Sequence, residues 1–193
     1  MRTSLHISVV LALALAACTP AGRRPPVDES LTPAEARLAT FRHGLTPATR
    51  LAGGAPSRDS LVTLIIRGIE QRDTALLRRL AVTKEEFAWL VYPTSAQGRA
   101  PYDLEPQAYW EMLFLHGNGG LTKALEAYGG SSLGVLGYSC DATETSEGEN
   151  RLVGPCLLRR RVASGQVVNE PLFSQLIERG GEWKVLSYAN KLD

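Results

Sequence analysis

The chain has 193 residues, and its hydrophobic share of 44% and aromatic share of 7% suffice for the core of one ordinary domain, which argues against global disorder. Its 21 basic and 20 acidic residues nearly cancel, so no overall charge attracts the chain to nucleic acid. No stretch approaches the roughly 20 consecutive apolar residues of a transmembrane helix.

The first residues have the layout of an export signal. The basic Arg2 precedes an apolar run over 7–17, which ends in the small residues of Leu15-Ala16-Ala17-Cys18. With a cysteine at this point, residues 1–19 resemble a bacterial lipoprotein signal peptide. The resemblance implies that residues 1–17 are removed and that Cys18 carries diacylglycerol and an acyl chain such as palmitate. An ordinary signal peptide with a chance cysteine is the alternative.

The same resemblance implies a location in the cell envelope. Lipid on Cys18 is then the membrane anchor, because several acyl chains attach a protein stably without a spanning helix. Thr19 follows the cysteine where an aspartate would direct retention, so analogy with Gram-negative sorting favours the outer membrane, facing the periplasm. Residues 18–30 are rich in proline and charge and predict a lipidated flexible tether.

Residues 31–54 predict an N-terminal helix and a linker. Thr32 is suited to the N-cap, Pro33 to the first helical position, and Glu35 completes a capping box. A Gly-Gly-Ala-Pro break follows, so we place the main domain at residues 55–193.

The first half of the main domain predicts helices. Apolar residues recur at helical spacing in five stretches, which begin at Ser57, Asp73, Thr83, Pro106 and Thr122. The stretch that contains Tyr109–Leu115 is apolar nearly all round, so we expect burial on more than one side. Asn118-Gly119-Gly120 is expected to end this helix before the short one that follows.

The second half of the domain changes to a period of two. Strands are predicted over 133–140, 156–163, 172–179 and 182–190. Gly180-Gly181 joins the last two as a tight hairpin. Helices followed by strands with short links predict an α+β fold, with N-terminal helices packed on a four-stranded antiparallel meander.

Once Cys18 is set aside, Cys140 and Cys156 remain as an even pair in an exported chain. Cys140 closes one predicted strand and Cys156 opens the next, so antiparallel pairing places them within bridging distance. We therefore expect a disulfide at the neck of a polar hairpin loop over 141–155, with two buried free thiols as the alternative. No histidine cluster accompanies the cysteines, so no metal site is predicted.

The helix over 57–73, the apolar helix around 109–115 and the closing strand over 183–188 together resemble the nuclear transport factor 2-like group, which includes ketosteroid isomerase-like enzymes. The resemblance covers about residues 57–191. It implies a cone-like fold in which a curved sheet wraps a long helix and leaves an apolar pocket at the open end. The group contains both enzymes and non-catalytic binding domains, so the fold alone does not choose a function.

The candidate pocket residues are ring-bearing side chains in the predicted helices: Trp89, Tyr92, Tyr109, Trp110 and His116. Each has a structural alternative, because aromatic rings commonly fill cores and a histidine at a helix C-terminus interacts with the helix dipole. An isomerase-like site needs a carboxylate facing a hydrogen-bonding acid. Asp141 and Glu170 lie at predicted strand ends, where carboxylates are usually solvated.

No serine-hydrolase, zinc-protease or nucleotide-binding motif occurs, and we predict neither a catalytic residue nor a cofactor. The sequence favours a membrane-anchored envelope lipoprotein whose domain binds an envelope protein or a small apolar ligand without catalysis. Two alternatives stay open: a small-pocket enzyme of the isomerase or dehydratase kind, and a purely structural envelope protein.

Overall fold

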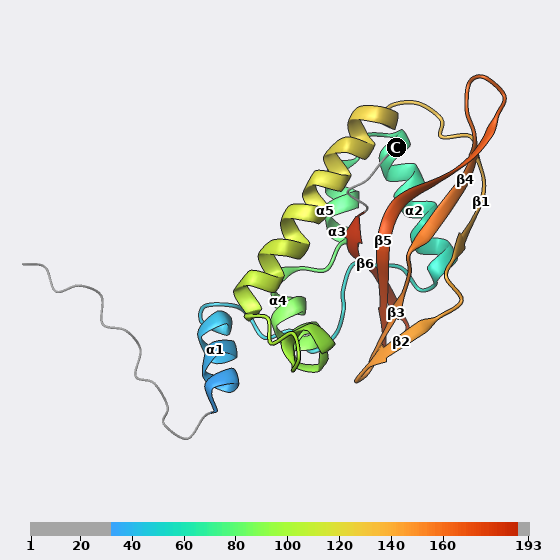
Figure 1. Cartoon of the computed structure of the whole chain (residues 1–193). Helices are drawn as coiled ribbons and strands as arrows, with labels where there is room; N and C mark the ends of the chain where they lie inside the picture. Colours follow the sequence, from blue (N-terminus) through green and yellow to red (C-terminus); the bar gives the residue numbers. More distant parts are fainter. Residues whose placement is uncertain (1–31, 189–193) are drawn as a thin grey trace, which may run out of the picture.

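The computed structural model describes residues 32–188. The signal segment, Cys18 and the tether lie outside these residues, as does the end of the last predicted strand. Within them, helices lie on one side of an open antiparallel sheet, which is the predicted α+β class (Figure 1). No helix over 32–188 is both long and apolar enough to cross a membrane.

The α-helices are α1 (Pro33–Arg42), α2 (Arg58–Glu70), α3 (Thr74–Leu80), α4 (Lys84–Glu86) and α5 (Pro106–Tyr128). A π-helical turn, η1 (Phe87–Val91), and two 3-10 turns, η2 (Tyr92–Thr94) and η3 (Ala96–Gly98), connect α4 to α5. The strands are β1 (Val135–Cys140), β2 (Glu144–Glu147), β3 (Asn150–Val153), β4 (Cys156–Arg161), β5 (Val167–Arg179) and β6 (Glu182–Tyr188).

Capping residues start the helices where the sequence predicts. At α1 the Glu35 backbone N–H donates to Thr32 Oγ1 at 3.3 Å, and the Thr32 N–H donates to Glu35 Oε2 at 2.8 Å. Ser57 caps α2 by accepting a hydrogen bond from the Ser60 N–H at 3.1 Å. These bonds satisfy N–H groups that the first helical turn leaves without partners.

The sequence prediction for α5 was wrong in two respects. The helix runs without interruption through Asn118-Gly119-Gly120, and it is not buried on several sides, since Met112, Phe114 and Leu115 are 40%, 50% and 66% exposed. A glycine costs a helix about 1 kcal/mol relative to alanine, which packing against the rest of the protein offsets here. Gly120, Leu121 and Ala124 are buried, which shows that this part of the helix packs against the rest of the protein.

Within residues 32–188 the sheet has six strands, so the prediction of four was wrong. Its order is β1-β4-β5-β3-β2, and β6 pairs with β5. The first part of β5 pairs with β4, residues 176–178 pair with β3, and β6 pairs with residues 173–179. The four predicted strands therefore pair in chain order, and the structure adds the β2–β3 hairpin inside the segment 141–155 that was predicted to be a loop.

The predicted disulfide is confirmed. Cys140 and Cys156 face each other in the antiparallel register of β1 and β4 and are bonded through their sulfur atoms. The bond joins the two strands at the point where the chain leaves for the β2–β3 hairpin.

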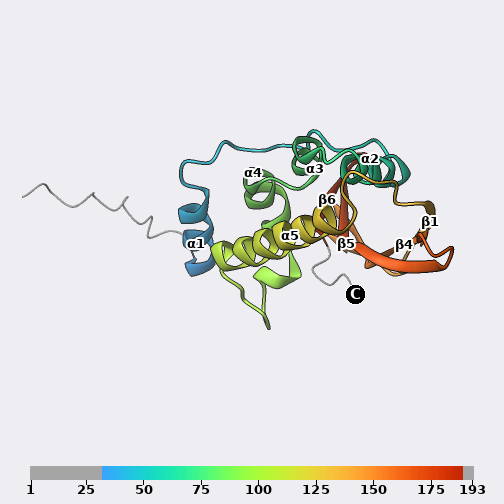
Figure 2. The same cartoon turned by 90° about the horizontal axis from the view of Figure 1, so that it is seen from above.

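Two clusters of buried side chains form the core. One joins α2 and α3 to the sheet, through residues such as Leu61, Ile65, Leu77, Phe173 and Leu176. The other lies among α1, η1, the start of α5 and the strands, with Phe87 at its centre. The Phe87 ring is 5.8 Å from that of Phe41 and 5.3 Å from that of Tyr109. Figure 2 shows the resulting shape, with α1 at one end and the tips of β1 and β4 at the other.

Candidate functional site

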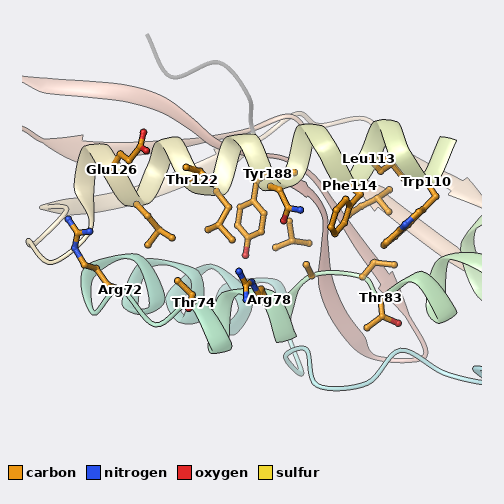
Figure 3. A pocket seen from close by; sticks show the side chains of 18 residues that line it. Arg72, Thr74, Arg78, Thr83, Trp110, Leu113, Phe114, Thr122, Glu126 and Tyr188 are labelled. Atoms are coloured by element: carbon orange, nitrogen blue, oxygen red, sulfur yellow. The ribbon is translucent and has the colours of Figure 1, made fainter. Parts of the chain in front are cut away.

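A groove of about 560 Å³ runs between α5 and α3 and has the end of β6 as its floor (Figure 3). Its volume lies within the range of about 300–1,000 Å³ that is typical of small-molecule sites. The three walls come from segments far apart in the sequence, which the core described above brings together.

One face of α5 supplies the first wall. Its lining residues recur three or four positions apart and so share one side of the helix: Trp110, Leu113, Phe114, Gly117, Leu121 and Leu125. Asn118, Thr122 and Glu126 follow the same spacing beside this stripe. The stripe is apolar, and it ranges from Phe114, which is 50% exposed, to the buried Leu121.

The opposite wall comes from α3 and the residues just after it, and β6 forms the floor. Arg78 lies on α3, and Ala81 and Val82 follow it. The Val82 N–H donates to the carbonyl oxygen of Val185 at 2.9 Å, which holds this segment beside β6. Tyr188 ends the described part of β6 and also lines the groove.

The two ends of the groove differ in polarity. Trp110, Leu113 and Phe114 gather at one end, whereas Arg72 and Glu126 lie at the other (Figure 3). Trp110 and Phe114 also contact each other, with ring centroids 5.7 Å apart. We call the first end the aromatic half and the second the polar half.

Tyr188 is a fixed part of the groove's floor. Its side chain is buried, and its hydroxyl donates a hydrogen bond to the carbonyl oxygen of Leu77 at 2.9 Å. Burial raises the pKa of this hydroxyl far above its ordinary value, so it stays neutral. Because its proton is already committed to Leu77, Tyr188 is poorly placed to donate a proton to a ligand.

Three of the charged side chains that the structure describes line the groove. Arg72 Nε donates to the carbonyl oxygen of Gly129 at 2.9 Å. The side chains of Arg78 and Glu126 make no hydrogen bond or ion pair with any of residues 32–188. Two arginines against one glutamate leave the described part of the lining with one positive charge.

Of the predicted pocket residues, Trp110 lines this groove and the other four do not. Tyr92 and Tyr109 are buried in the second core cluster, where burial raises the pKa of both hydroxyls. The Tyr92 hydroxyl donates to the carbonyl oxygen of Leu104 at 2.7 Å. These two side chains therefore hold the fold together.

Trp89 and His116 also lie outside the groove. Trp89 packs at the edge of the second core cluster, and the Arg42 guanidinium carbon stands 3.9 Å from its ring centroid. His116 is exposed on α5, one position away from the groove-facing Gly117. Since each helical residue is rotated about 100° from the last, one position is enough to leave the lining face.

A second, polar pocket of about 250 Å³ lies near Trp183. Its charges neutralise one another: Arg58 and Arg151 approach Glu144 at 3.9 Å and 3.5 Å. Asp59 accepts a hydrogen bond from the Tyr138 hydroxyl. This pocket is smaller and its charged groups are already paired, so the groove along α5 is the stronger candidate.

The groove brings no acid–base pair together among the residues that the structure describes. Its carboxylate, Glu126, lies at the polar end (Figure 3), and its tyrosine hydroxyl is bonded to Leu77. Over 32–188 no group of three or more His, Cys, Asp or Glu side chains is arranged to hold a metal ion. Comparison of this chain with known protein families, with curated proteins and with solved structures finds no match.

Proposed function

We propose that this protein is an exported, lipid-anchored envelope protein whose domain binds a small apolar ligand in the groove between α3 and α5, without catalysing a reaction. The observation that carries the proposal is the groove itself, with its apolar α5 stripe and its volume of about 560 Å³. A half-enclosed cavity of this size is better suited to bind a small molecule than to bind the surface of another protein.

The anchor and the location rest on the sequence. The segment Leu15-Ala16-Ala17-Cys18 supports lipidation at Cys18, and Thr19 supports sorting to the outer membrane. The disulfide between Cys140 and Cys156 agrees with export, because such bonds persist in oxidising compartments.

For the fold we infer the cone-like arrangement of the nuclear transport factor 2-like group. Three of the strand pairings, β1 with β4, β4 with β5 and β5 with β6, contain register shifts. Bulges of this kind bend a sheet and increase its twist. The long helix α5 and helix α2 lie on the same side of the sheet, as a cone requires (Figure 1).

Binding is favoured over the isomerase or dehydratase alternative by the chemistry of the lining. Such an enzyme requires a carboxylate and a proton donor that converge on one substrate atom. Here the Tyr188 hydroxyl is held by Leu77, and Glu126 lies at the polar end of the groove, with its carboxylate pointing away from the Tyr188 ring (Figure 3).

Gly117 allows a direct test, because it lines the groove and an added Cβ meets nothing closer than 3.9 Å. We expect Gly117→Phe to fill the groove and to abolish binding of a neutral apolar fluorophore, N-phenyl-1-naphthylamine. Gly117→Ala is the matched control. It should bind the fluorophore and gain about 0.5–1 kcal/mol in free energy of unfolding, because alanine is the better helix former.

The measurement uses the mature chain with Cys18→Ala, exported through a leader that lacks a lipidation cysteine, so that no lipid competes with the fluorophore. Fluorescence enhancement reports binding, and circular dichroism checks that both variants are folded. If folded Gly117→Phe enhances the fluorescence as much as the parent Cys18→Ala chain does, the fluorophore does not bind in the groove.

A further inference from the structure

We infer that the ligand of the groove is an amphiphile with a carboxylate at one end, which pairs with Arg78, and an apolar body that lies in the aromatic half. This inference rests on the proposed function and names the chemical class that the groove accepts. Its basis is the position of an unpaired guanidinium at the boundary between two halves of different polarity.

Arg78 is a cation of the groove that has no partner among residues 32–188. Its side chain has no hydrogen-bond or ion-pair partner in the described part of the chain, while Arg72 already donates through Nε to Gly129. Figure 3 places Arg78 across from Tyr188, between the end marked by Arg72 and the end marked by Trp110. The guanidinium therefore lies midway along the groove, where it can meet one end of a ligand whose body extends to one side.

The apolar body has room on one side of Arg78. From Asn118 to Trp110 the helix α5 advances about 12 Å, at 1.5 Å per residue. Along this distance the groove is lined by Leu113, Phe114 and Gly117 on α5, with Val185 in the floor. The α5 wall and the floor are thus apolar here, and the Thr83 hydroxyl on the opposite wall already accepts a hydrogen bond from the Glu86 N–H (Figure 3). An extended hydrocarbon chain can therefore lie along this half without burying an unpaired polar group.

The charges of the lining favour a carboxylate over a phosphate. A planar guanidinium presents paired N–H donors that match the two oxygens of a carboxylate. Among residues 32–188 the lining carries one net positive charge, since Glu126 offsets one of the two arginines. A monoanion is neutralised by this charge, whereas a dianion leaves an excess negative charge in the groove.

Asn118 supplies a second polar contact near the same place. It lies on α5, four residues before Thr122, so both side chains share the face beside the apolar stripe. Neither side chain has a hydrogen-bond partner within residues 32–188. The Asn118 amide and the Thr122 hydroxyl are therefore free to donate to a carboxylate held by Arg78.

The test compares two ligands that differ only at the polar end, dodecanoate and dodecanol, both kept below their aggregation limits. Each displaces N-phenyl-1-naphthylamine from the mature Cys18→Ala chain. We expect dodecanoate to displace the fluorophore at about a five- to tenfold lower concentration than dodecanol, as expected for a charge-assisted pair that is partly open to water. Raising the salt concentration should reduce this preference, because salt screens exposed charges.

Arg78→Gln is the decisive variant, and Arg79→Gln is its matched control. Arg79 is the next residue of α3 and does not line the groove. We expect Arg78→Gln to remove the preference for dodecanoate while leaving dodecanol unaffected, and Arg79→Gln to keep the preference. Arg78→Lys should retain part of it, because an ammonium group keeps the charge but not the paired geometry.

The possible failures separate the two proposals. Equal displacement by both ligands, or a preference that survives Arg78→Gln, overturns the role of Arg78 and leaves binding in the groove intact. If neither ligand displaces the fluorophore, or if folded Gly117→Phe binds as the parent chain does, the proposed function fails. A concentration-dependent dimer that Gly117→Phe abolishes would assign the groove to a second copy of the chain.

Discussion

Lys184 is a charged residue inside the core, and its partners explain why it is tolerated there. Its side chain is fully buried on β6, and its ammonium lies 2.8 Å from Glu86 Oε2 and 2.9 Å from the carbonyl oxygen of Ala52. Glu86 Oε1 in turn accepts a hydrogen bond from the Ala52 N–H at 2.7 Å. This network ties the segment before α2, the helix α4 and the last strand to one another.

Removing one partner of this buried pair should cost more than removing both. We expect Lys184→Met to lower the free energy of unfolding by about 3–5 kcal/mol, because it leaves the Glu86 carboxylate buried without its cation. The double variant Lys184→Met with Glu86→Leu should recover part of that loss. Urea denaturation followed by circular dichroism measures both changes.

An exposed pair provides the contrast. Arg37 and Asp103 are 3.0 Å apart, with 32% and 59% of their side chains accessible, so Asp103→Asn should change the stability by less than about 1 kcal/mol. If Lys184→Met unfolded at the same urea concentration as the parent chain, the structural role assigned to the buried pair would be wrong.

At the scale of elements, α5 shows both what the sequence could predict and where it failed. The sequence predicts its start at Pro106 and its apolar content. It also predicts an end at Asn118-Gly119-Gly120, because such a run typically ends an isolated helix. Tertiary packing against β6 carries the helix through it. Because the break was expected there, the stripe that continues past Gly117 to Leu121 was not recognised as one face.

The β2–β3 hairpin escaped prediction for a different reason. Asn150 reads as a loop residue, yet it is 1% exposed, and its amide donates to the Leu90 carbonyl oxygen at 2.7 Å and to Thr94 Oγ1 at 3.1 Å. Leu90 and Thr94 are 60 and 56 residues away from Asn150 in the sequence. No local pattern can indicate such a bond.

The disulfide should contribute to stability mainly by restricting the unfolded chain. It joins residues 16 positions apart, and a loop of about that size is worth about 3 kcal/mol in the chain-entropy model. We expect a Cys140→Ser, Cys156→Ser double variant to lose roughly that much free energy of unfolding. Denaturation with and without dithiothreitol measures it. Dithiothreitol should destabilise the parent chain but leave the double variant unchanged, and an equal effect on both would contradict the assignment.

For the whole molecule, the groove depends on packing that joins distant segments. Trp110 was the groove residue that sequence reasoning selected, because its helix was recognised. Arg78 and Tyr188 were missed, since nothing in their own neighbourhood shows that α3 and β6 meet α5. The class of fold and the disulfide could be predicted from local patterns, whereas the site required the tertiary arrangement.

The connection between the folded domain and its proposed lipid anchor also concerns the whole molecule. The salt bridge between Arg37 and Glu105, at 3.2 Å, holds α1 beside the start of α5. Residues 19–30 precede α1 and, fully extended at about 3.3 Å per residue, reach about 40 Å. If Cys18 carries the proposed anchor, we expect the anchor and the folded domain to be separable, so that removing the anchor leaves the domain folded.

Replacing Cys18 with alanine in the full chain tests this separation. Without the thiol, no diacylglycerol can be attached, so we expect metabolic labelling with palmitate to disappear and the protein to leave the membrane fraction or to remain unprocessed. Thermal unfolding of the released domain should match that of the lipidated protein, because the core lies after residue 32. A Cys18→Ala chain of mature size that stays in the membrane fraction would contradict the lipid anchor, and Thr19→Ala is the control that should keep both labelling and attachment.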